Sequence, residues 1–256
     1  PQPYIKDTLF INKVEISFDN KYIVAIDPPK QRIGSERLLN GLNVFDIGTG
    51  ELLYSFSYKS SISTFGISNT GTENNKIIIS YFNNDIIILD LATGKELHKI
   101  TENTHTTSYS CSPKINEDGN LLAFGSIDGT ISVWNLMNNK LMYELEGHVN
   151  DIVAMNFGDS LISDYPVLIS HGIDEVIKYW NLETGKLLLS YIEMEDNNWI
   201  CYDPYYRYDA SNEKVLESLY FTCGLEIVDL KQVKGPLHVP NLFFNILHGD
   251  TLAGIK

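Results

Sequence analysis

The sequence predicts an all-β fold built from repeated four-stranded sheets, and two features of a recurring segment support this. The segment consists of an apolar run, an acidic or amide side chain and a turn, and it occurs four times, with that side chain at Asp46, Asp90, Asn135 and Asn181. After each turn, which is Thr-Gly or Asn-Asn, a second apolar alternation begins. Gly and Asn accept the positive φ of tight hairpin turns, so each segment predicts a β-hairpin.

Two further strand-like runs precede the hairpins. In the first repeat they are Val14–Phe18 and Tyr22–Ile26, and in the third they are Thr107–Cys111 and Leu121–Ser126. Four strands in each unit, rich in Ile, Val, Phe and Tyr, make one antiparallel sheet. The anchors recur every 44 to 46 residues, which is close to the length of one β-propeller blade.

Specific residues carry a resemblance to a known repeat family. Leu121–Asn135 reads Leu-Leu-Ala-Phe-Gly-Ser-Ile-Asp-Gly-Thr-Ile-Ser-Val-Trp-Asn, and the fourth repeat carries Gly147-His148 and Trp180-Asn181. These residues resemble WD40 repeats. The first two repeats are degenerate, because they lack the Gly-His pair and carry Phe45 and Leu89 where Trp is typical of the family. The resemblance covers about residues 10–192 and implies a WD40-type β-propeller with four clear blades.

The resemblance also implies a hydrogen-bond network inside the fourth blade, formed by His148, Ser170, Asp174 and Trp180. An indole N–H is donor-only and needs a buried acceptor, which a hydroxyl supplies, and the hydroxyl can then donate to the imidazole. A Ser-His-Asp trio also occurs in hydrolases. We favour the structural interpretation, because the spacing belongs to the repeat and the chain has no Gly-x-Ser-x-Gly motif. No catalytic residue is therefore predicted.

The chain divides by sequence into three parts. Residues 1–192 are expected to form blades one to four, residues 193–235 a divergent fifth blade or a β-rich tail, and residues 236–256 a short helix and tail. The whole is expected to be a fragment of a larger protein. Pro240 and Gly249 bound a helix at about Asn241–Leu247, which packs on the propeller rim or docks a neighbouring domain.

The C-terminal part is also similar to a tail found in bacterial WD40 proteins. The matching pieces are Trp199, Tyr205–Ser211, Leu225–Leu230 and Val239–Leu242. In multidomain members this tail lies beside caspase-like peptidase or other signalling domains. The resemblance implies a neighbouring effector domain in the parent chain.

Two segments are candidates for partner binding. Aromatic side chains with a polar tip favour interfaces, which points to Trp199, Tyr205, Tyr206 and Arg207, although strand alternation would bury part of this cluster. The loop at Pro28–Gly41 interrupts the first repeat and carries basic residues at Lys30, Arg32 and Arg37. It forms either a contact site or a disordered loop.

Composition excludes several function classes. A formal net charge of −14 opposes binding to nucleic acid or to an anionic membrane. No apolar run is long enough to span a bilayer. Three dispersed cysteines without a CxxC pair favour a reducing compartment, and hence the cytoplasm. The six histidines lack metal-ligand spacing and no phosphate-binding loop is present, so no metal or cofactor is expected.

The predicted function is a non-catalytic protein–protein interaction scaffold, or a regulatory or sensor propeller, with a protein or peptide partner. Propeller faces built from loops bind partners without chemistry. Two alternatives remain open. One is a propeller hydrolase acting on lactones or glycans, and the other is a structural assembly module whose blade edges pair with another copy.

Overall fold

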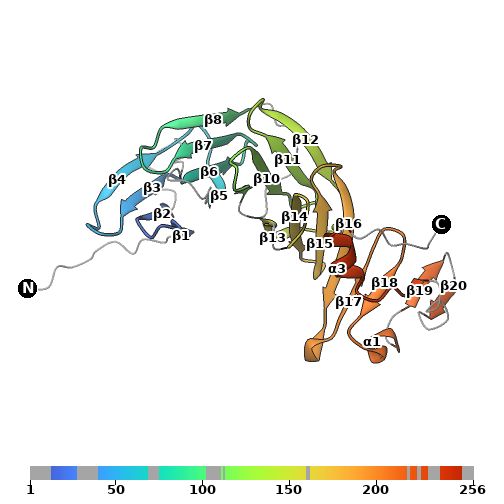
Figure 1. The fold of residues 1–256 in the computed structure, drawn as a ribbon. Coiled ribbons are helices and arrows are strands. Elements are labelled where there is room, and N and C mark those ends of the chain that lie inside the picture. The colour runs from blue at the N-terminus through green and yellow to red at the C-terminus, as the bar shows by residue number, and fades with distance from the viewer. Residues whose placement is uncertain are drawn as a thin grey trace, which may run out of the picture. The chain divides into compact units, whose positions relative to one another are not determined.

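The structure is a computed structural model that describes residues 13–27, 40–68, 75–101, 111, 113–159, 162–217, 220–223, 226–229 and 237–249. The side chains of 220–229 are not described. Strands dominate, and the few helices are short (Figure 1). Within the described residues, none of the helices has the length and hydropathy needed to cross a bilayer.

Three four-stranded sheets and one larger sheet account for the predicted repeats. The strands of the first, second and fourth sheets pair antiparallel. Their bounds are β1 Val14–Ile16, β2 Tyr22–Ile26, β3 Leu42–Asp46 and β4 Leu52–Phe56; β5 Ile62–Ser68, β6 Lys76–Tyr81, β7 Ile86–Asp90 and β8 Glu96–Ile100; β9 Lys114–Ile115, β10 Leu121–Gly125, β11 Ile131–Asn135 and β12 Lys140–Leu145; and β13 Ile152–Phe157, β14 Val167–Gly172, β15 Val176–Asn181 and β16 Lys186–Glu193. The predicted all-β fold with blade-like sheets is confirmed.

The four anchor residues hold equivalent places at the end of the third strand of each sheet. There each side chain accepts a backbone N–H from the following turn, with Oδ1 at 2.8 Å from the nitrogen; the pairs are Asp46 with Thr49, Asp90 with Thr93, Asn135 with Met137 and Asn181 with Glu183. The residue that completes each turn has a positive φ, at Gly50, Gly94, Asn139 and Gly185. In each repeat, the hairpin is thus fixed by a hydrogen bond from the turn to the anchor side chain and by a residue with a positive φ.

The first strand of the third sheet differs from the prediction. Residues 107–110 of the expected strand Thr107–Cys111 lie outside the described residues, and the structure has the first strand at Lys114–Ile115. The reason is the tight turn that follows, in which Asn116 Oδ1 accepts the backbone N–H groups of Asn120 and Leu121. The strand that pairs with Leu122 therefore ends directly before that turn, at Ile115.

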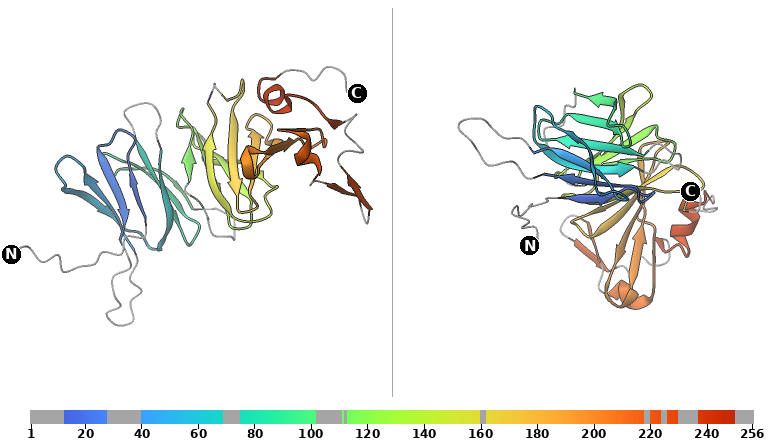
Figure 2. Two further views of the ribbon diagram at one scale, coloured as in Figure 1. Left: turned by 90° about the horizontal axis from the view of Figure 1, so that it is seen from below. Right: turned by 90° about the vertical axis from the view of Figure 1, so that its left-hand side faces the viewer.

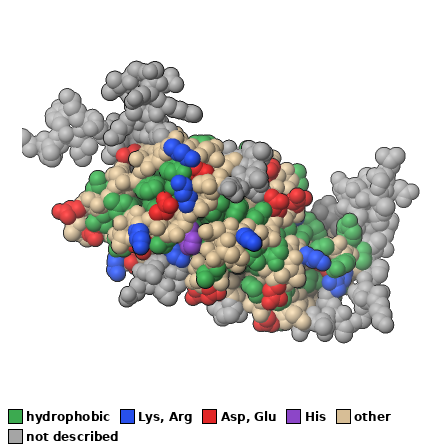
Figure 3. All heavy atoms as spheres, turned by 90° about the horizontal axis from the view of Figure 1, so that it is seen from above, with side chains coloured by type: hydrophobic (Ala, Val, Ile, Leu, Met, Phe, Trp, Pro, Cys, Tyr) green, Lys and Arg blue, Asp and Glu red, His purple; other side chains and the backbone are tan. Residues whose placement is uncertain are grey.

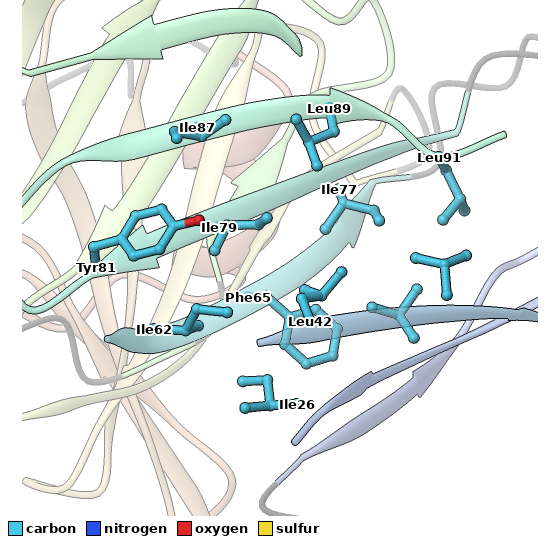
Figure 4. Packing of buried hydrophobic residues seen from close by; sticks show 12 residues of the cluster. Ile26, Leu42, Ile62, Phe65, Ile77, Ile79, Tyr81, Ile87, Leu89 and Leu91 are labelled. Carbon is cyan, nitrogen blue, oxygen red and sulfur yellow. The ribbon is translucent and has the colours of Figure 1, made fainter. Parts of the chain in front are cut away.

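Cα packing divides the chain into two compact units, Pro1–Phe124 with Trp134–Lys140, and Gly125–Val133 with Leu141–Lys256. The third sheet contributes to both. In the first unit, one face of β1–β4 packs against one face of β5–β8 (Figure 4). Branched aliphatic side chains such as Val44, Ile77 and Leu89 are fully buried between them. This core is the main source of stability for the first two sheets.

A tyrosine on the outer strand of one sheet contacts the hairpin turn of the next sheet in each unit. In the first unit, the Tyr54 hydroxyl donates to Leu91 O at 2.7 Å. In the second, the Tyr143 hydroxyl donates to Glu183 O at 2.8 Å. A side chain added at Gly94 or Gly185 would meet the ring of Tyr54 or Tyr143, so glycine at these turns serves both the positive φ and the close ring contact.

For the segment after residue 192 the sequence predicts either a divergent fifth blade or a β-rich tail. Strands β17 Trp199–Tyr202 and β18 Tyr208–Ala210 pair onto β16, so the fourth sheet has six strands. Strands β19 Tyr220–Cys223 and β20 Glu226–Asp229 form only a two-stranded hairpin. The cause is the short turn at Glu195–Asn197, which returns the chain directly beside β16. The choice between a divergent fifth blade and a β-rich tail for residues 193–235 stays a prediction.

Two short helices pack on this extended sheet. Helix α3 Leu242–Leu247 lies against β16 and β17 (Figure 2), where Leu242 is buried with Leu189 and Cys201. This confirms the predicted C-terminal helix. Helix α1 Glu213–Glu217 was not predicted, and it buries Val215 and Leu216 against Tyr208. The division at residues 192 and 235 remains a prediction.

Candidate functional site

The structure brings together the four residues of the predicted network in the fourth sheet. His148 precedes β13, Ser170 lies on β14, Asp174 lies in the turn that follows, and Trp180 lies on β15. His148 Nδ1 is 3.0 Å from both carboxylate oxygens of Asp174. His148 Nε2 is 2.8 Å from Ser170 Oγ, which accepts the Trp180 indole N–H at 2.8 Å.

These distances define one consistent assignment of protons. The indole donates to Ser170, the Ser170 hydroxyl donates to His148 Nε2, and His148 Nδ1–H donates to Asp174. Two backbone N–H groups, of Val149 and Val176, also donate to the Asp174 carboxylate at 3.2 Å. Each polar side-chain atom of this network, from the indole to the carboxylate, therefore has a hydrogen-bond partner, as a buried polar network requires.

Burial sets the charge state of the network. Burial lowers the pKa of His148 below its ordinary 6.5, and the hydrogen bond and charge of Asp174 oppose this only in part. For Asp174, burial raises the pKa, but hydrogen bonds from His148, Val149 and Val176 outweigh it and leave the pKa below 3.8. The imidazole is neutral and the carboxylate ionised at pH 7, in agreement with the proton assignment.

Sequence reasoning missed two residues beside this network. Lys178 is buried, its Nζ donates to Ser190 Oγ at 3.1 Å, and burial lowers its pKa against the attraction of Asp174. A Cβ on Gly172 would lie 2.6 Å from both Asp174 Oδ1 and His148 Nδ1. Lys178 breaks the apolar alternation of its strand, which is a readable signal, whereas the space around Gly172 can be seen only in three dimensions.

The geometry favours a structural role for the trio. Ser170 is 1% exposed and its oxygen already accepts the indole N–H, whereas a nucleophile needs an accessible oxygen near oxyanion donors. Burial also raises the pKa of Cys201 to about 12, which suits a core thiol. In the described part of the chain, no three His, Cys, Asp or Glu side chains are grouped for metal binding. The absence of catalytic, metal and cofactor sites remains a prediction.

Acidification is expected to destabilise the fold through His148. Because its folded-state pKa lies below 6.5, the unfolded chain takes up the proton first, so stability is complete above pH 6.5 and falls below it. The loss is at most about 1.4 kcal/mol for each pH unit below the unfolded-state pKa. Urea unfolding at pH 7.5 and 5.5 measures it. For His148→Gln, the free energy of unfolding should differ less between the two pH values than it does for the wild-type protein. An equal difference would contradict the role of His148 in the pH dependence.

The second candidate site is the turn between β17 and β18, named here the aromatic turn and comprising Asp203, Pro204, Tyr205, Tyr206 and Arg207. The Asp203 carboxylate, 1% exposed, accepts the backbone N–H groups of Tyr205 and Arg207 at 2.9 Å. It also accepts the Arg207 guanidinium N–H at 2.6 Å. Tyr206 has a positive φ of 63°. The turn is therefore held from within by one buried carboxylate.

The aromatic turn exposes part of the predicted binding cluster. Tyr205 is 75% and Tyr206 62% exposed. Arg207, in contrast, is mostly buried, because its guanidinium is paired with Asp203. Trp199 is half-buried and stacks on Tyr191 with ring centroids 6.0 Å apart. Of the other predicted contact residues, Lys30, Arg32 and Arg37 lie outside the described residues.

Charge is mixed on the face that Figure 3 presents, where acidic and basic side chains are interspersed with apolar ones. Single-sign fields steer nucleic acid and anionic lipid, whereas mixed surfaces suit proteins.

Residues 94–135 match the family model described as WD domain, G-beta repeat. This range contains Leu121–Asn135 and confirms the resemblance to WD40 repeats. The chain is 34% identical over 131 residues to Protein ROOT INITIATION DEFECTIVE 3 of Arabidopsis thaliana, which is 47% of this chain and 29% of that protein. It is 31% identical over 128 residues to Nuclear distribution protein PAC1 of Komagataella phaffii, covering 45% of this chain and 25% of that protein.

A third relative is Cilia- and flagella-associated protein 337 B of Tetrahymena thermophila, with 32% identity over 114 residues. The match covers 43% of this chain and 8% of that protein. The chain therefore spans less than a third of the length of each of these three relatives.

Proposed function

We propose that the chain is a non-catalytic protein-interaction module and that the aromatic turn contacts its protein or peptide partner. The match of residues 94–135 to the WD domain family model supports this. Two tyrosines that are 75% and 62% exposed on one rigid turn carry the proposal. Tyrosine buries a large area on binding at a small entropic cost, since it has few rotatable bonds. A turn fixed by Asp203 in the free protein lowers that cost further.

The second part of the proposal concerns the full-length protein. These residues are proposed to belong to a longer polypeptide with a neighbouring effector domain, supported by the similarity of the C-terminal part to bacterial WD40 tails. The proposed location is the cytoplasm, supported by the three dispersed cysteines, among which there is no CxxC pair. The proposed partner is neither nucleic acid nor membrane, supported by the acidic net charge.

The aromatic turn is expected to cross-link to the partner and to dominate its affinity. A photoreactive phenylalanine placed at Tyr206 in the full-length protein should form a covalent adduct with the partner in cells. The purified partner is then titrated by calorimetry with Tyr205→Ala and Tyr206→Ala. Each change should weaken binding about tenfold or more, because truncating an interface aromatic costs at least ~1–2 kcal/mol.

The matched control is Phe82→Ala, which removes a side chain that is 61% exposed in the turn after β6. It should leave the affinity unchanged. Equal affinities for the wild-type protein and both tyrosine variants would contradict the proposed contact. Turnover of a lactone or glycan by the purified protein would contradict its non-catalytic character.

A further inference from the structure

Helix α3 lies on one face of the fourth sheet, where it contacts β16, β17 and β18 (Figure 1). Because residues directly opposite in a sheet point to one side, the pairings Tyr179–Leu189 and Tyr191–Cys201 each place two side chains on this face. Leu189 and Cys201 are 0% exposed, and both pack with residues of α3. We call Tyr179, Leu189, Tyr191, Trp199 and Cys201 the covered face.

The covered face corresponds to the face of the first sheet that packs against the second. In both sheets this face includes the side chain two residues before the anchor and its partner on the following strand. The pair is Val44 with Tyr54 in the first sheet and Tyr179 with Leu189 in the fourth. The second sheet packs on the first pair, whereas α3 packs on the second pair. A helix of six residues therefore takes, on the fourth sheet, the place that a sheet takes on the first.

Aromatic rings dominate the covered face. Phe243 of α3 meets Tyr179 and Tyr191 edge-on, with ring centroids 5.2 and 6.0 Å apart. Tyr191 in turn stacks on Trp199. If α3 left, the rings on the sheet would be exposed side by side, and exposed apolar patches of this kind mark surfaces through which proteins associate. A second copy of the chain presents the same rings, and one patch can meet its own copy across a twofold axis.

Helix α3 is held by few buried side chains and by hydrogen bonds at its two ends. Of its six residues, Leu242 and Leu247 are buried. Before the helix, the Asn241 backbone N–H donates to Asp209 Oδ2 at 2.7 Å. At its last residue, Leu247 O accepts the Ser163 hydroxyl at 2.9 Å. So short a helix is not stable by itself, and segments with few buried side chains open at a low free-energy cost. Helix α3 can thus leave while the sheet stays folded.

We propose that α3 is a removable cap that prevents self-association: when it leaves, the covered face pairs with the covered face of a second copy. The cap thereby makes the oligomeric state of the chain depend on one short helix. This inference goes beyond the proposed function and does not rest on the aromatic turn.

The test is Leu242→Asp in residues 1–256, which places a carboxylate against Leu189 and Cys201 and so releases α3. Because the substituted side chain leaves with the helix, the sheet keeps all of its own residues. Light scattering over a series of protein concentrations should show a monomer for the wild-type chain and a dimer for the variant.

The thiol of Cys201 reports which surface is used. At the lowest protein concentration, maleimide should label Cys201 about tenfold faster or more in Leu242→Asp than in the wild-type chain, because the cap is open. As the protein concentration rises, the labelling should slow again, because the second copy covers Cys201. Peptide mapping by mass spectrometry separates Cys201 from the other two cysteines.

The matched control is Phe244→Asp, because Phe244 belongs to the same helix but is 56% exposed. It should change neither the mass nor the labelling rate. If Leu242→Asp unfolds the chain, as circular dichroism would show, Ser163→Ala takes its place. It removes only the hydroxyl that Leu247 O accepts, and it should shift both readouts in the same direction by a smaller amount.

Fast labelling of Cys201 in a folded variant that stays monomeric at every concentration would overturn the proposal, because the uncovered face would then not self-associate. Dimers in which Cys201 stays fast to label would overturn it too, since they would use another surface. So would a folded Leu242→Asp variant in which mass and labelling match the wild-type chain, because α3 would then not be removable.

Discussion

Replacing Trp180 by alanine is expected to lower the free energy of unfolding by about 3–5 kcal/mol, the usual range for a buried tryptophan. Trp180 is 2% exposed, and its indole N–H donates to Ser170. The change therefore removes packing and leaves Ser170 without its donor. Urea unfolding followed by circular dichroism measures the loss.

Comparing two Trp→Phe substitutions separates the contribution of the Trp180 hydrogen bond from that of packing. Trp180→Phe should cost about 1–2 kcal/mol more than Trp134→Phe, since only the former leaves a buried partner unsatisfied. Trp134 Nε1 has no hydrogen-bond partner among the described residues. If both substitutions lower the free energy of unfolding equally, the hydrogen bond of Trp180 adds nothing to stability beyond packing.

The second large effect is expected from Gly172→Ala, which should lower the free energy of unfolding by about 2–4 kcal/mol by disturbing a buried polar pair. The added Cβ would lie 2.6 Å from Asp174 Oδ1 and from His148 Nδ1, so the geometry of the hydrogen bond between them cannot persist unchanged. Thermal and urea unfolding at pH 7.5 measure the effect.

The control for this variant is Gly41→Ala, because a Cβ there meets only the Phe56 carbonyl oxygen at 3.5 Å. Its cost should stay within about 0.5 kcal/mol. In a His148→Ala background the cost of Gly172→Ala should shrink, since the two positions touch and their effects are non-additive. An unchanged cost in that background would contradict the steric explanation.

The features that could be predicted from the sequence are those set by contacts between residues close together in the chain. Asp46 and Asn181 set their hairpins through contacts within three residues, so the repeat and its turns follow from the sequence. The network of His148 and Trp180 was also predictable, because its residues hold fixed places in a repeated motif.

The unpredicted part depends on contacts between distant segments. Which edge β17 joins is a matter of tertiary pairing, so a fifth blade and an extended fourth sheet are equally compatible with the residues after 192. The five residues of α1 are too few to show a helical period. Arg207 is a predicted partner-binding residue, but its guanidinium pairs with the buried Asp203 and leaves the side chain only 19% exposed.

The tyrosine contacts between successive sheets have a consequence for how each unit unfolds. Tyr54 holds the turn after β7, and Tyr143 holds the turn after β15. Each turn thus completes its hydrogen bonds only when the preceding sheet is formed. Local opening of the first sheet therefore weakens the second, and opening of the strand that carries Tyr143 weakens the fourth, so within each unit partial unfolding spreads from one sheet to the sheet that follows it.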